Sequence, residues 1–119
     1  MAFTIKPRTI SNVTVLDMSG RLCFMEYALR EMVNAFLREG QRNFVFNLAE
    51  VPYIDSFGLG QLVTVWTSIK MKGGRVTLVQ PGKRVRDLLK ITKLEIVFPI
   101  FDDEATAIED AGFETPKNR

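Results

Sequence analysis

The chain has 119 residues, of which 46% are hydrophobic and 25% charged, a composition typical of one soluble domain with one core. Its net charge of +2 is too small for a protein that binds nucleic acid through a basic surface. The sequence has no histidine and a single cysteine, Cys23, which excludes Ser-His-Asp and Cys-His catalysis, zinc sites built from those residues, and an internal disulfide. The composition therefore favours a binding protein over an enzyme, with no metal and no cofactor.

No apolar run approaches the roughly 20 residues that a membrane-spanning helix requires. The first ten residues also lack the charged and apolar regions of a signal peptide. We therefore expect a reduced, cytoplasmic protein that does not insert into a membrane and has no nucleic-acid partner.

The first half of the chain predicts two strands, at residues 3–8 and 12–18, followed by a helix from Met25 to Glu39. Gly40 fits the end of this helix. The apolar residues recur every three or four positions and so share one face: Leu29, Met32, Val33, Phe36 and Leu37.

A buried strand at residues 43–48 follows, and a second helix is expected from Phe57 to Lys72. Gly73-Gly74 ends it before another strand at residues 75–80. The inward face of the second helix should present Leu59, Leu62, Val63, Trp66 and Ile69.

The last part predicts a short helix at residues 83–90, with Val85, Leu88 and Leu89 inward, and a final strand at 96–101. Pro99 places this strand at an edge, or marks its end. Asp102 or Asp103 can cap a last helix that continues to Ala111.

This order of elements predicts a single α/β domain with a mixed, mostly parallel β-sheet covered by about four helices. We place the domain at residues 1–113, with a polar C-terminal tail at residues 114–119.

The most unusual stretch is YIDSFGLG at residues 53–60, where a loop enters a helix whose first turns contain two glycines. Glycine costs about 1 kcal/mol relative to alanine inside a helix. In a purely structural interpretation, Ser56 is the N-cap, its hydroxyl reaches the amide of Gly58 or Leu59, and the glycines allow close packing. In a functional interpretation, Ser56 is exposed to a kinase, and its phosphate would lie at a helix N-terminus, which tolerates anions.

The segment IDSFGLG at residues 54–60 resembles the Asp-Ser-Ser/Thr-Gly-Leu-Gly motif of the STAS-domain anti-sigma factor antagonists. The resemblance extends over residues 3–111. Further matching segments are Gly20-Arg21-Leu22, Phe44 to Leu48, Gly73-Gly74 through Val79, Val85 to Leu89, and Ile100-Phe101-Asp102.

This resemblance implies a bacterial regulator of transcription that works by partner switching and catalyses no reaction. Ser56 would be phosphorylated by an anti-sigma factor that is also a serine-protein kinase. The unphosphorylated form would bind that factor and release the sigma factor, and a PP2C-type phosphatase would reset the switch. The implied partner-binding residues are Tyr53, Asp55, Ser56, Phe57, Gly58, Leu59, Gly60 and Gln61.

Two positions depart from the family pattern. Phe57 stands where a small hydroxyl residue is common, and Cys23 stands where an acidic residue is common. An aromatic side chain beside Ser56 can strengthen a partner contact or pack onto the sheet. The loss of a carboxylate would change the electric field at a phosphate on Ser56.

Two other functions remain open. The first is a STAS module that does not switch and serves as a scaffold or an accessory subunit, for example of a transporter. The second is a small-ligand or nucleotide-binding protein, although Val63 replaces the third glycine of a dinucleotide fingerprint and no phosphate-binding loop motif occurs.

Three surface features bear on partners. Lys83, Arg84 and Arg86 form a basic cluster that is either a solvated helix face or a contact for an acidic partner. The acidic run at residues 102–104 is explained by the start of a helix, without a metal. An exposed edge strand near the N-terminus permits a monomer or a weak homodimer.

Overall fold

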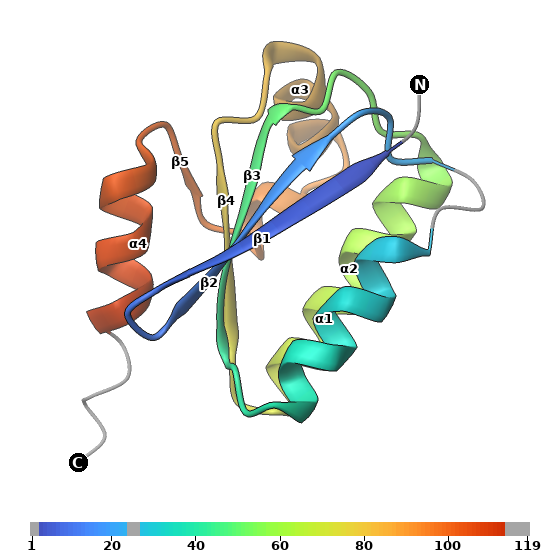
Figure 1. Cartoon of the computed structure of the whole chain (residues 1–119). Helices are drawn as coiled ribbons and strands as arrows, with labels where there is room; N and C mark the ends of the chain where they lie inside the picture. Colours follow the sequence, from blue (N-terminus) through green and yellow to red (C-terminus); the bar gives the residue numbers. More distant parts are fainter. Residues whose placement is uncertain (1–2, 24–26, 114–119) are drawn as a thin grey trace.

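The computed structural model describes residues 3–23 and 27–113. Its centre is one five-stranded sheet in the order β1-β2-β3-β4-β5 (Figure 1). The strands are β1 Thr4–Ile10, β2 Val13–Ser19, β3 Asn43–Glu50, β4 Arg75–Val79 and β5 Ile100–Phe101. β1 pairs with β2 in an antiparallel sense and all other neighbours are parallel, which confirms the predicted mixed, mostly parallel sheet.

In the described part of the chain four α-helices cover this sheet, which agrees with the predicted number of about four. Helices α1 (Ala28–Arg38) and α2 (Ser56–Met71) lie side by side on one face, and α4 (Glu104–Phe113) lies on the other (Figure 1). The remaining helix, α3 (Lys83–Ile91), follows β4 and leads into a short 3-10 helix, η1 (Leu94–Ile96). Among residues 3–23 and 27–113, no helix has both the length and the apolar character that crossing a bilayer requires.

The core has two parts, one on each face of the sheet. The larger part fills the space beneath α1, α2 and α3 and contains Phe44 and Phe46, whose rings meet edge to face at 6.5 Å. The smaller part lies beneath α4 and is formed by Val13, Val15, Val45, Val79, Ala107 and Ala111. Successive side chains of a strand point to opposite faces, so the near-continuous apolar runs of β2 and β3 supply both parts.

The structure corrects two predicted elements. The predicted strand at residues 96–101 is reduced to Ile100–Phe101, because η1 ends at Ile96, a turn follows at residues 97–98, and Pro99 lacks the amide that a longer ladder would need. The predicted inward position of Val63 is wrong, since its side chain is 38% exposed and Val65 is buried instead. The described part of the first helix begins at Ala28, and the predicted start at Met25 and the tail 114–119 lie outside the described residues.

Candidate functional site

The loop that leads into α2 is fixed by the backbone of a neighbouring segment. Leu22, just after β2, forms a parallel bridge with Ile54, and both side chains are buried. The Leu22 amide donates to the Tyr53 carbonyl at 3.1 Å, and the Asp55 amide donates to the Leu22 carbonyl at 3.3 Å. These bonds hold the loop at the point where the chain turns into α2.

The N-cap of α2 is Asp55, and the prediction that Ser56 is the N-cap is wrong. The Asp55 carboxylate accepts a hydrogen bond from the Gly58 amide at 2.8 Å. Aspartate and serine are equally good N-caps, and the bond to Leu22 selects the earlier residue. Ser56 is therefore the first residue of the helix, it is exposed, and its hydroxyl makes no hydrogen bond within the described chain.

The two glycines at the start of α2 have different surroundings. A Cβ atom at Gly58 would lie 2.1 Å from the carbonyl oxygen of Leu22, so the helix can approach this backbone only with glycine there. A Cβ atom at Gly60 would meet nothing within 4 Å. Packing within the chain thus explains Gly58, whereas Gly60 lies on the open surface.

The exposed side of α2 is free of charge over its first three turns. Between Ser56 and Ile69 the sequence contains no charged residue. The Thr64 and Thr67 hydroxyls each donate to a carbonyl one turn earlier in the helix, at 2.9 Å, so they do not need a partner outside it. We call this exposed side the α2 surface, and its members are Ser56, Phe57, Gly60, Val63, Thr64 and Thr67.

Two arginines meet at Tyr53, in the loop before the α2 surface. The Arg21 guanidinium lies 5.1 Å from the centre of the Tyr53 ring, and the Arg84 guanidinium lies 5.3 Å from it. Neither arginine forms an ion pair within the described residues. Cation–π contacts of this kind fix the position of a guanidinium without neutralising its charge.

The other members of the predicted basic cluster are neutralised. Lys83 pairs with Asp87 at 2.9 Å, and Arg86 pairs with Asp102 at 2.7 Å. The positive charge beside the loop therefore comes from Arg84 and from Arg21, a residue that sequence reasoning did not assign to the site.

The predicted partner-binding residues divide into three groups. Ser56, Phe57 and Gly60 are exposed, and Phe57 is 58% exposed. Tyr53, Asp55 and Leu59 are half-buried, whereas Gly58 and Gln61 are buried. The exposed residues are extended along α2 by Val63, Thr64 and Thr67, which the uncharged run from Ser56 to Ile69 could have indicated.

The sequence profile of the STAS domain matches residues 4–107. The chain belongs to the STAS domain family. A candidate anti-sigma factor antagonist from Thermotoga neapolitana is 37% identical over 75 residues, which are 63% of this chain and 66% of that protein, a little under two thirds of its length. The anti-sigma F factor antagonist of Paenibacillus polymyxa is 27% identical over 100 residues, which are 82% of this chain and 86% of that protein.

Solved structures show the same STAS fold. The crystal structure of a candidate anti-sigma factor antagonist from Thermotoga maritima has a TM-score of 0.83 at 28% identity and covers 91% of this chain and 94% of that one. A sulfate transporter family protein from Wolinella succinogenes has a TM-score of 0.73 at 18% identity, covering 88% of this chain and 89% of that one. The second likeness concerns the fold alone, so membership of the STAS family does not by itself define what this domain binds.

Proposed function

We propose that this STAS domain is an anti-sigma factor antagonist that binds its anti-sigma factor through the α2 surface and is switched by phosphorylation of Ser56. The observation that carries this proposal is the position of Ser56, exposed at the first residue of α2 and next to the exposed ring of Phe57. The names of the relatives in Thermotoga and Paenibacillus support the same class of partner.

The position of Ser56 explains why a phosphate would act on the complex rather than on the fold. A phosphoserine carries about −1.5 to −2 charges at neutral pH. The N-terminus of a helix accepts such a group because its amides and its dipole favour negative charge. An uncharged partner face that covers Phe57 and Gly60 would have to remove water from the phosphate, which strongly disfavours the complex.

The arginines at Tyr53 supply a second, electrostatic part of the same interface. An acidic area on the anti-sigma factor would face Arg21 and Arg84, which no acidic side chain of the described chain neutralises. Charges at the rim of an interface mainly increase the rate of association. The α2 surface then provides the contact area and the arginines guide the approach.

The partners follow from this role. The anti-sigma factor is also the serine-protein kinase that modifies Ser56, and its capture by the unphosphorylated domain releases the sigma factor. A PP2C-type phosphatase removes the phosphate and restores binding. The domain itself is a ligand and a substrate, with no catalytic residues of its own.

The test is the affinity of the domain for the kinase–anti-sigma factor of the same organism, measured by calorimetry for the wild type, Ser56→Ala and Ser56→Asp. We expect the first two to bind equally and Ser56→Asp to lose at least about 2 kcal/mol of binding free energy. Thr9→Asp is the matched control, because it adds the same charge at an exposed position of β1.

Equal binding by all variants would disprove the switch and favour a STAS scaffold that does not respond to phosphorylation. The kinase reaction gives an independent readout, since labelled phosphate should enter the wild type and be absent from Ser56→Ala.

A further inference from the structure

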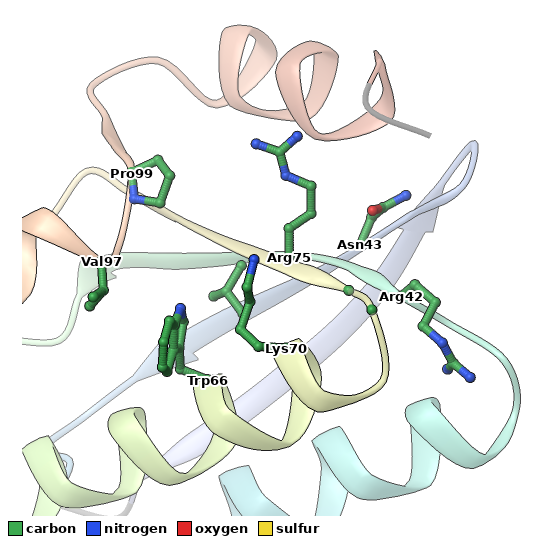
Figure 2. A pocket seen from close by; sticks show the side chains of 10 residues that line it. Arg42, Asn43, Trp66, Lys70, Arg75, Val97 and Pro99 are labelled. Carbon is green, nitrogen blue, oxygen red and sulfur yellow. The ribbon is translucent and has the colours of Figure 1, made fainter. Parts of the chain in front are cut away.

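A groove of about 630 Å³ lies at the end of α2 that is remote from Ser56 (Figure 2). Its volume is in the range of small-molecule sites in proteins. Ser56 and Lys70 stand 14 positions apart in one helix, a separation of about 21 Å. The groove is lined by the end of α2, the starts of β3 and β4, and the segment before β5: Arg42, Asn43, Trp66, Lys70, Gly73, Gly74, Arg75, Val76, Val97 and Pro99.

The groove exists because the sheet is incomplete beside β4. The Leu78 amide donates to the Pro99 carbonyl at 2.9 Å. The backbone amides and carbonyls of the even-numbered residues of β4 therefore point toward β5. The backbone groups of Val76 point in the same direction, but Pro99 has no amide that could donate to the Val76 carbonyl. Within the described chain no backbone hydrogen bond reaches Val76 from that side. The amide and the carbonyl of Val76 therefore lack a backbone partner on this side, and Val76 lies at the floor of the groove with only 2% of its surface exposed.

The charge of the lining is positive, because it contains three basic residues and no acidic one. Lys70 is exposed and forms no ion pair within the described residues. The Arg42 guanidinium donates to the carbonyls of Leu37 and Gln41, at 3.0 and 2.8 Å, and points away from Lys70 and Trp66 (Figure 2), so it contributes little to the charge of the groove. Arg75 pairs with Asp110 at 3.3 Å, so it contributes less.

One wall of the groove is apolar and flat. The Trp66 ring is held edge to face against Phe98, with 6.4 Å between ring centres, and Val97 and Pro99 also line the groove. Figure 2 shows the indole nitrogen of Trp66 and the ammonium of Lys70 extending from α2 into the space below Pro99. The groove thus presents hydrogen-bond donors and a cation beside a surface that suits a ring.

We propose that this groove is a binding site for a small aromatic molecule that carries one oxyanionic group, either a carboxylate or a phosphate. The anionic group is held by the exposed Lys70 ammonium, and the ring lies against Trp66, Val97 and Pro99. Charge-assisted hydrogen bonds provide the selectivity for an anion. This site is separate from the proposed switch at Ser56 and does not depend on it.

Trp66 is the only tryptophan of the chain, so its indole N–H gives a single signal in a ¹H–¹⁵N NMR spectrum. We would titrate the full chain with benzoate, phenyl phosphate, neutral benzamide and inorganic phosphate. Benzoate or phenyl phosphate should shift this signal in a saturable way with a millimolar dissociation constant, as expected for ligands of this size. Benzamide and inorganic phosphate should each bind at least about tenfold more weakly.

Lys70→Gln removes the proposed anion contact, and Lys72→Gln is the matched control because Lys72 does not line the groove. We expect Lys70→Gln to weaken benzoate or phenyl phosphate at least about fivefold and Lys72→Gln to leave the affinity unchanged. The stronger of the two probes would identify the carboxylate or the phosphate as the preferred group. Equal binding of benzamide, equal binding of inorganic phosphate, or wild-type affinity in Lys70→Gln would each overturn the proposal.

Discussion

The two glycines at the start of α2 differ in what explains them, because one is required by packing within the fold and the other is not. Gly58 has a structural reason, because any Cβ atom there would collide with the carbonyl of Leu22. Gly60 has open space around it and still carries the cost of a glycine inside a helix. A residue that weakens a helix without helping it to pack is a good candidate for contact with something outside the chain.

We predict opposite effects on stability for Gly58→Ala and Gly60→Ala. Gly58→Ala should lower the free energy of unfolding by about 1–3 kcal/mol, because the Leu22 backbone cannot move away easily. Gly60→Ala should raise it by about 0.5–1 kcal/mol through helix propensity. Urea unfolding measures both, and a change of the same sign in the two variants would contradict this assignment.

A second residue-scale prediction concerns Gln61, whose side-chain oxygen is buried and has no hydrogen-bond partner among residues 3–23 and 27–113. Gln61→Met has nearly the same shape and should raise the free energy of unfolding by about 1 kcal/mol, because it removes an unsatisfied polar atom. Gln41→Met is the matched control, and we expect it to change the free energy of unfolding in the opposite direction. The oxygen of Gln41 accepts from the buried hydroxyl of Thr14 at 3.0 Å, so its loss should destabilise the domain.

The sequence could identify the neighbourhood of the site but not its capping residue. Asp55 and Ser56 are adjacent, and either could cap a helix. The choice depends on the Leu22–Ile54 bridge, which joins segments more than thirty positions apart in the chain. Arg21 and Arg84 are each also more than thirty positions from Tyr53, so the sequence does not predict that both contact its ring. The exposure of Ser56, in contrast, follows from local features alone.

At the scale of helices and strands, periodicity predicted most of the architecture. The inward face of α1 is the predicted one, with Leu29, Val33 and Leu37 buried. For α2 the prediction was wrong at Val63, because this helix has apolar residues on several sides and its period alone does not orient it. The length of β5 could not be predicted from the sequence either, since η1, which precedes β5, packs against α3.

The start of α4 gives an element-scale prediction for pH. The Asp103 carboxylate accepts from the hydroxyl and the amide of Thr106, at 2.6 and 2.9 Å, and these bonds lower the pKa of Asp103 below its usual range. Because the pKa of Asp103 is lowered in the folded state, these hydrogen bonds contribute fully to the stability of the folded chain above the ordinary aspartate pKa of about 4. This contribution is lost as the pH falls through the lowered value.

An NMR titration of the Asp103 side chain tests this assignment. Thr106→Val removes the hydroxyl and keeps the amide, so the pKa of Asp103 should rise part of the way toward the usual value. An unchanged pKa in Thr106→Val would show that the hydroxyl has no role.

At the scale of the whole molecule, the two ends of the sheet present different surfaces. The end near Ser56 combines the uncharged α2 surface with the charges of Arg21 and Arg84, and the other end holds the groove (Figures 1 and 2). The open edge of the sheet at β1 carries Lys6, Pro7 and Arg8, which discourage pairing with another strand. We therefore expect a monomer whose contacts with partners use its ends.

The last prediction is that Arg84→Glu slows association with the kinase–anti-sigma factor. Reversing a rim charge acts on the association rate, and we expect a reduction of about tenfold at low salt with little change in dissociation. Lys83→Glu changes the net charge equally at the adjacent position, but the Lys83 ammonium is directed to Asp87 and not to the Tyr53 ring, so its effect on this contact should be smaller. Surface plasmon resonance at several salt concentrations measures both rates, and the difference should fade as salt screens the charges. Equal slowing by the two variants would mean that net charge alone guides the approach, whereas a loss confined to Arg84→Glu would assign that task to the arginines held on Tyr53.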